Sequence, residues 1–153
     1  MKNRLLLISV LFLVLISCRK DDNVDIQNEI VGTWKMTKDI IISGKDNSII
    51  STDPVLDSDC ESKNRYTFDS SNRYSYSDHK KTSSICKLFK TANGDYSYDN
   101  STKKLTIKFD GSNESVTSNL HSLKTNEMQL IQEDYNDYNN DGINDKFITV
   151  FNK

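Results

Sequence analysis

A short segment near the end of the printed sequence carries oxygen-rich side chains at the spacing of a calcium-binding loop. It reads Asp-Tyr-Asn-Asn-Asp-Gly-Ile-Asn-Asp over residues 137–145. Oxygen atoms at the first, third, fifth, seventh and ninth positions suit a hard cation, and glycine at the sixth permits the sharp turn. The candidate ligands are Asp137, Asn139, Asp141, the carbonyl group of Ile143, and Asp145.

Two features of the same segment argue against calcium. The twelfth position, where such loops place a bidentate glutamate, is Ile148, and no helical pattern flanks the segment. A polar hairpin turn at Asp141-Gly142 accounts for the same residues without a metal. Both interpretations stay open, and a bound cation is expected to have a weak affinity, on the order of 10⁻⁴ to 10⁻³ M.

The chain has 3 cysteines, Cys18, Cys60 and Cys86. Neither Cys60 nor Cys86 belongs to a C-x-x-C motif, and neither histidine stands at a ligand-like spacing from them. This disfavours a redox pair or a two-cysteine metal site. In an oxidising compartment, the pair predicts a disulfide between Cys60 and Cys86.

No nucleophile, histidine and acid stand in a catalytic arrangement. His79 falls in a polar stretch and His121 in a stretch rich in Ser and Asn, so both are expected on the surface. The chain has no G-x-S-x-G motif and no glycine-rich phosphate loop, and its carboxylates fall mainly in turns. The formal net charge of -2 excludes bulk binding of nucleic acid. The sequence therefore predicts a protein that is not an enzyme.

The first 17 residues have the pattern of a signal peptide. Lys2 and Arg4 precede an apolar run over residues 5–16, which spans about 18 Å as a helix and is too short to cross a bilayer. The pair Ser17-Cys18 resembles the bacterial lipobox, whose cysteine becomes the lipidated first residue of the mature protein. We therefore expect fatty acyl chains such as palmitate on Cys18 and anchoring to the outer membrane of the cell envelope.

Residues 18–29 are expected to form a tether between the lipid and the folded domain. Its first residues, Cys-Arg-Lys-Asp-Asp over 18–22, resemble a signal that some Gram-negative bacteria use to display lipoproteins on the outer surface. A simple solvated tether has the same composition. Surface display and a periplasmic orientation both stay open.

The remaining residues, 30–153, predict a single all-β domain. The chain has one alanine, Ala92, and is rich in Asn and Ser, which compete with a helix backbone for hydrogen bonds. Alternation of apolar and polar residues, separated by short polar turns, predicts strands and antiparallel neighbours. We expect eight strands, over residues 30–43, 64–69, 72–78, 94–99, 103–110, 114–123, 127–135 and 146–152.

Two stretches between these strands, 44–63 and 79–93, read as a long loop and an irregular segment, and the disulfide would tie them together. A short turn of helix is expected near 24–29. Eight antiparallel strands in sequence order predict an up-and-down barrel, which removes exposed sheet edges. A sandwich of two sheets is the alternative.

Gly32-Thr33-Trp34 at the start of the first strand resembles the G-x-W motif of lipocalins. The order of the segments 66–74, 94–98 and 105–107 is similar to that in lipocalin-like lipoproteins of Gram-negative bacteria, and the resemblance covers residues 28–153. It implies that Trp34 plugs the closed end of a barrel, often beneath an arginine from a late strand. This chain has no arginine after Arg73, so that partner is either missing or replaced by a lysine such as Lys146.

The expected function is that of a lipid-anchored envelope protein whose barrel holds a small apolar ligand without covalent chemistry. The alternative is a surface-displayed module with a filled barrel, in which the stretches 44–63 and 79–93 contact proteins or glycans. The inward positions expected to line the ligand site are Met36, Ile40, Tyr66, Phe68 and Tyr74.

Overall fold

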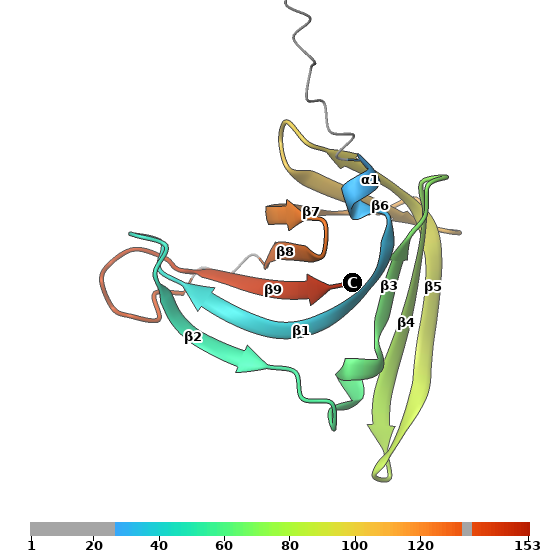
Figure 1. Cartoon of the computed structure of the whole chain (residues 1–153), viewed down its shortest axis with the longest axis horizontal. Coiled ribbons are helices and arrows are strands. Elements are labelled where there is room, and N and C mark those ends of the chain that lie inside the picture. Colours follow the sequence, from blue (N-terminus) through green and yellow to red (C-terminus); the bar gives the residue numbers. More distant parts are fainter. Residues whose placement is uncertain (1–26, 133–135) are drawn as a thin grey trace, which may run out of the picture.

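A computed structural model describes residues 27–132 and 136–153, and Figure 1 shows that these residues form a curved, almost entirely β structure. The expected signal peptide, Cys18 and most of the tether lie outside the described residues. A short helix comes first, as expected. The elements are α1 (Gln27–Ile30), β1 (Gly32–Ile42), β2 (Ile49–Pro54), the 3-10 helix η1 (Cys60–Lys63), β3 (Arg65–Phe68), β4 (Arg73–Thr82), β5 (Ile85–Asp99), β6 (Lys104–Phe109), β7 (Ser115–Lys124), β8 (Glu127–Gln132) and β9 (Lys146–Asn152).

The strands form one closed antiparallel sheet. From β3 to β9 each strand pairs with the next one along the chain, β3 also pairs with β1, and β9 pairs back with β1. Short polar turns join most of these strands, and such links permit only antiparallel neighbours. The predicted all-β, eight-stranded, up-and-down arrangement is confirmed, with β1 and β9 meeting at the seam.

An additional strand, β2, lies where the sequence predicted a loop over 44–63. It pairs with residues 38–42 of β1, whereas β3 pairs only with residues 32–34. Because β3 is short, the rest of that edge of β1 is open, and β2 covers it. The prediction of a loop without a strand was therefore wrong for residues 49–54.

The prediction of an irregular segment over 79–93 was also wrong. The β4–β5 pairing continues from Arg73 opposite Asp95 to Thr82 opposite Ile85, so these residues form a long hairpin. Ser83 and Ser84, with φ of 50° and 67°, make its tight turn. Figure 1 shows the hairpin extending past the rest of the sheet, at the end of the molecule away from α1.

The predicted disulfide is confirmed. Cys60 of η1 and Cys86 of β5 are bonded, with 5.4 Å between their Cα atoms. The bridge fastens the segment after β2 to the projecting part of the hairpin.

The interior holds one main apolar cluster, to which most strands contribute. Partly buried side chains, including Met36, Tyr66, Tyr76 and Phe109, pack against it. The buried members of the cluster are Ile30, Trp34, Phe68, Tyr74, Tyr96, Leu105, Leu120, Met128 and Phe151.

Among the described residues, no helix is long and apolar enough to cross a membrane.

A bulge in β1 separates a second apolar cluster from the first. The pairing of β1 with β9 shifts by one residue between Met36 and Lys38. Met36 lies opposite Phe151, but Ile40 lies opposite Ile148, which is on the other face of β9. Ile40 therefore packs with Ile42, Ile148 and Val150 rather than with the interior cluster.

Candidate functional site

Trp34 closes the end of the barrel next to α1. Its side chain has no exposed surface, and its indole N–H donates a hydrogen bond of 2.7 Å to the carbonyl of Ile30. The Nζ atom of Lys153 lies 4.6 Å from the ring centroid and donates a 2.7 Å hydrogen bond to the carbonyl of Glu29. A cation over the electron-rich face of an indole is attracted to it, so Lys153 completes the plug.

This geometry corrects the expectation that Lys146 replaces the family's arginine. The Nζ atom of Lys146 donates instead to Asn47 Oδ1, at 3.0 Å. Lys146 is the first residue of β9, and Lys153 directly follows its last residue. Which of the two lysines reaches Trp34 therefore depends on the register in which β9 pairs with β1. The amino-acid pattern alone contains no signal for that choice.

Aromatic rings line the interior beside the plug. The ring centroids of Phe68 and Tyr74 are 5.2 Å apart, and those of Phe68 and Tyr96 are 5.0 Å apart. All three side chains are buried, and the Tyr96 hydroxyl donates a 2.8 Å hydrogen bond to the carbonyl of Asp69. Burial raises the pKa of Tyr74 and Tyr96, so both stay neutral at physiological pH.

Farther from α1 the interior becomes more polar and less buried. The rings of Tyr66 and Tyr76 lie 4.7 Å apart. Burial is the main cause that raises the pKa of both tyrosines and of nearby Asp39. Asp39 accepts a 2.7 Å hydrogen bond from the Thr149 hydroxyl. This region offers aromatic faces together with neutral hydroxyls and a carboxyl group.

The structure brings together four of the five predicted ligand-lining residues. Phe68 and Tyr74 belong to the interior cluster, and Met36 and Tyr66 pack against it while remaining half-buried. Ile40 lies outside this group because of the β1 bulge. Ligand contact by these residues stays a prediction.

Further interior residues were not among the five predicted ligand-lining positions, although Tyr76 and Tyr96 could have lined a cavity or faced solvent on the sequence alone. Tyr76, Tyr96, Ile107 and Phe109 all belong to the interior cluster or pack against it. Their alternation with polar neighbours in the sequence was a usable signal, because residues two apart on a strand share a face.

A hollow of about 390 Å³ opens where β6 ends and β5 continues with β4 as its partner. It is lined by Phe109, Asp110 and residues 90–93. Because Phe109 also packs against the interior cluster, this hollow adjoins the apolar interior at one point. Its volume falls within the range of small-molecule sites.

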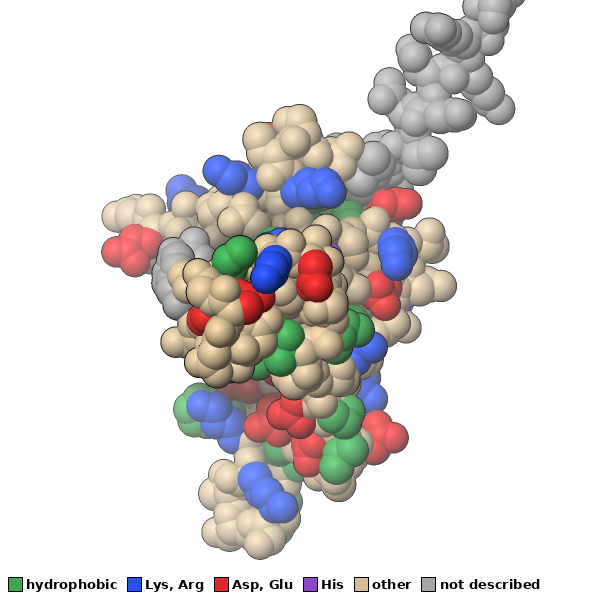
Figure 2. Space-filling view, turned by 90° about the vertical axis from the view of Figure 1, so that its left-hand side faces the viewer, with side chains coloured by type: hydrophobic (Ala, Val, Ile, Leu, Met, Phe, Trp, Pro, Cys, Tyr) green, Lys and Arg blue, Asp and Glu red, His purple; other side chains and the backbone are tan. Residues whose placement is uncertain are grey.

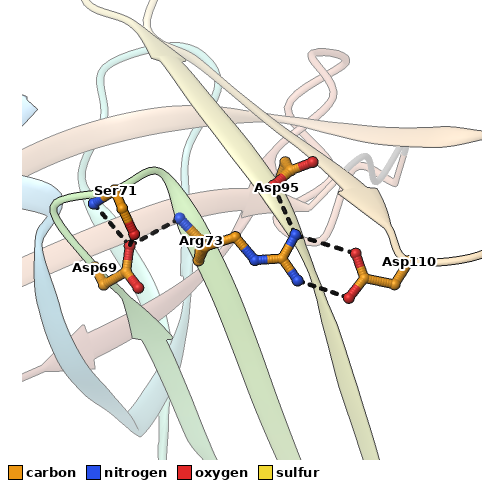
Figure 3. A network of polar contacts seen from close by, with 5 residues as sticks. All are labelled: Asp69, Ser71, Arg73, Asp95 and Asp110. Atoms are coloured by element: carbon orange, nitrogen blue, oxygen red, sulfur yellow. Dashed lines mark hydrogen bonds and ion pairs between the residues drawn. The ribbon is translucent and has the colours of Figure 1, made fainter.

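An ion-pair network fastens three strands on the outside of the barrel (Figure 3). The Arg73 guanidinium lies 2.7 Å from Asp95 and makes contacts of 3.1 and 2.6 Å with the two carboxylate oxygens of Asp110. The carboxylate of Asp69 accepts hydrogen bonds from the backbone N–H groups of Ser71 and Arg73. The Arg73 contact lowers the pKa of Asp110, and the network links β4, β5 and the residue that follows β6.

The side chains proposed to bind a cation lie in one loop, but they accept hydrogen bonds from backbone N–H groups. Asp137 accepts hydrogen bonds from the N–H groups of Asp141 and Gly142, at 3.1 and 2.8 Å. Asp145 is buried and accepts hydrogen bonds from the N–H groups of Gly44 and Tyr138, at 3.0 and 2.7 Å. Within residues 27–132 and 136–153, no group of three or more His, Cys, Asp or Glu side chains could hold a metal ion.

Asn139 and Ile143 complete the same loop. The Oδ1 atom of Asn139 accepts a 3.0 Å hydrogen bond from the Asp141 N–H, and the Ile143 N–H donates to Asp141 Oδ1 at 2.9 Å. The side chains that could ligate calcium therefore stabilise the turn itself in this structure. Calcium binding stays a prediction.

The two histidines lie on different strands, His79 on β4 and His121 on β7. Burial and the nearby lysines Lys146 and Lys103 lower the pKa of His121. Figure 2 shows that acidic and basic side chains are interspersed on the face it presents.

This chain is similar to a solved structure of low sequence identity. That structure is of a lipocalin-like protein from Bacteroides uniformis ATCC 8492, with 14% sequence identity and a TM-score of 0.47, and the match covers 82% of this chain and 98% of that chain. No curated protein matches this sequence. The family model described as "Lipocalin-like domain" matches residues 30–130. The match covers most of the chain, which therefore belongs to the lipocalin-like domain family.

Proposed function

We propose that this protein is a lipid-anchored envelope protein whose barrel binds a small apolar ligand. The observation that carries the proposal is that the exposure of the interior side chains increases from the end closed by Trp34 to the end lined by half-buried aromatic residues. Trp34 has no exposed surface, whereas Met36, Tyr66 and Tyr76 remain partly accessible. Apolar walls with a few convergent polar groups are typical of small-molecule sites.

The chemistry of the half-buried end defines the ligand class. Tyr66 and Tyr76 supply aromatic faces and neutral hydroxyls, and Asp39 supplies an acceptor whose pKa is raised by burial. A ligand with an apolar body and a hydrogen-bonding group at one end matches this arrangement. Binding would proceed by burial alone, because the described residues contain no catalytic arrangement.

Titration with anilinonaphthalene sulfonate, a fluorescent apolar probe, tests the ligand site. Met36→Trp should fill the interior and weaken probe binding by about tenfold or more, because the larger indole would occupy the space in which the probe is buried. Thr67→Trp is the matched control, because Thr67 is paired with Ser75 on the face opposite the interior. Equal binding by wild type and both variants would contradict a site inside the barrel.

Mass spectrometry of small molecules that co-purify with the native protein would identify the ligand class. An apolar compound retained by wild type and lost in Met36→Trp supports the proposal. The absence of any bound compound, together with no probe binding, would favour the second candidate, a surface module with a filled barrel. The projecting β4–β5 hairpin is the observation that favours this candidate.

The anchor rests on the signal-peptide pattern that ends at Cys18. Cys18→Ser should move the protein from the membrane fraction to the soluble envelope fraction, because acyl chains provide the attachment. Protein that stays with membranes after this substitution would contradict the lipid anchor. Protease treatment of intact cells would then distinguish surface display from a periplasmic orientation.

A further inference from the structure

Half of the longest strand has an edge with no partner. β5 pairs with β4 from Ile85 to Asp95, but only residues 94–99 pair with β6 on the other side. Within the described parts of the chain, no strand pairs with the second edge of residues 85–93. Unpaired N–H and C=O groups of this kind are a template for another strand.

One hydrogen bond shows which way the backbone N–H and C=O groups point where this free edge begins. The carbonyl of Asn93 accepts a 2.9 Å hydrogen bond from the N–H of Asp110, just past the end of β6. Asn93 therefore turns its backbone polar groups toward the β6 side. Because the direction alternates along a strand, Thr91 presents its N–H and C=O on the same, unpaired side.

The free edge has side chains that would stabilise an added strand. Three large apolar residues of β5 are well exposed, Ile85 at 60%, Leu88 at 57% and Phe89 at 62%. The hollow of about 390 Å³ lies at the end of the edge, next to Phe109. A partner strand would thus gain apolar contacts along the edge and an anchoring site at its end.

The projecting part of the same hairpin is basic in a chain whose net charge is -2. Residues 79–94 contain four lysines, at positions 80, 81, 87 and 90, and no aspartate or glutamate. None of these lysines is among the ion pairs formed between described residues. Lys80 Nζ lies instead 4.0 Å from the ring centroid of Phe89.

We propose that the free edge of β5, over residues 85–93, binds an extended acidic segment of a partner polypeptide by strand addition. The backbone edge supplies the hydrogen bonds, and the lysines select an acidic partner. The free edge lies beyond the part of β5 that pairs with β6, so the inference does not depend on a ligand inside the barrel.

The observations favour this occupant over two others. A second copy of the chain would place the four lysines of one hairpin against those of another, and like charges repel. A lipid surface would require apolar side chains at the hairpin tip, but the tip is Thr82-Ser83-Ser84. The exposed apolar residues run along the strand instead, where an extended peptide would contact them.

Fluorescence anisotropy with labelled peptides of about ten residues, the length of the free edge, tests the proposal. The probe is a peptide of alternating glutamate and valine. One control has lysine in place of glutamate, and another keeps the glutamates but has prolines that remove alternate N–H donors. The glutamate peptide should bind the full-length protein, and both controls should bind at least about tenfold more weakly.

Two variants assign the binding to the edge. Lys87→Glu combined with Lys90→Glu should abolish binding, whereas the matched pair Lys45→Glu with Lys104→Glu, at exposed sites outside the hairpin, should not. Thr91→Pro should also weaken binding, because it removes an N–H on the free side while leaving the β4 ladder intact. Thermal melting would confirm that each variant is folded.

Three results would overturn the proposal. Equal affinity for the glutamate peptide and its proline-containing control would mean general charge attraction without strand addition. No binding at millimolar peptide would mean that the lysines only protect an exposed edge from aggregation. Binding to phosphatidylglycerol vesicles that Thr91→Pro leaves unchanged, without peptide binding, would assign the hairpin to a lipid surface.

Discussion

Removal of the Cys60–Cys86 bridge should lower the stability of the fold mainly because the unfolded chain gains conformational entropy. The two residues are 26 positions apart. In the chain-entropy treatment, closing a loop of this length stabilises the folded state by about 3.5 kcal/mol at 25 °C. The folded geometry around the bridge has other support, since Lys81 pairs with Cys86 in the β4–β5 ladder and the Ser62 hydroxyl donates to the Asp59 carbonyl. We therefore expect the variant to fold and to melt at a lower temperature.

The Tm of the double variant Cys60→Ser/Cys86→Ser should fall by roughly 10–15 °C for a domain of this size. Circular dichroism melts of wild type, the double variant and wild type with reductant provide the measurement. The last two should agree. In the single variant Cys60→Ser, Cys86 should become reactive toward iodoacetamide, whereas folded wild type should show no reactive thiol. A decrease of less than a few degrees, or ready alkylation of both wild-type cysteines, would refute the reasoning.

Three further outcomes are expected at other sites. Trp34→Ala should reduce the free energy of unfolding by about 3–5 kcal/mol in urea titration, because it empties a fully buried site and leaves the Ile30 carbonyl without its donor. A loss below 1 kcal/mol, on the order of a surface substitution, would contradict the plug. The hydroxyls of Ser101 and Thr102 lower the pKa of Asp99 to about 2, so its contribution to stability is present above its ordinary pKa near 3.8 and disappears between that value and about 2. Ser101→Ala should raise this pKa in an NMR titration, and an unchanged titration would refute the assignment. Several millimolar calcium should raise the Tm relative to EDTA in wild type but not in Asp141→Ala, and equal melting in wild type would leave the loop as a polar turn.

Alternation was sufficient to predict the strands that have one buried face. Tyr66 and Phe68, Tyr74 and Tyr76, and Leu105 and Ile107 each share a face, and the short polar turns between their strands require antiparallel pairing. These local signals led to the barrel. The disulfide was predictable because only two cysteines remain once Cys18 is assigned to the lipid.

The missed features depend on contacts between distant parts of the chain. Pairing with β1 makes residues 49–54 a strand, although their own pattern ends in Asp53-Pro54 and is largely exposed. Pairing with β4 likewise extends β5 through an exposed, lysine-rich stretch. The bulge near Thr37 places the side chain of Ile40 on the opposite face of the sheet from that of Met36. Simple alternation counted from Met36 cannot detect the bulge.

The seam between β1 and β9 has a consequence for the time course of folding. It joins residues such as Met36 and Phe151, which lie at opposite ends of the domain sequence. A barrel closed by such distant partners has a high contact order, and folding in milliseconds to seconds is typical of that topology. During synthesis, strands β3 to β7 can form hairpins early, but Trp34 cannot become fully buried until β9 has left the ribosome. Until then the chain exposes two unpaired sheet edges, so the interval before closure is the period of greatest exposure to aggregation.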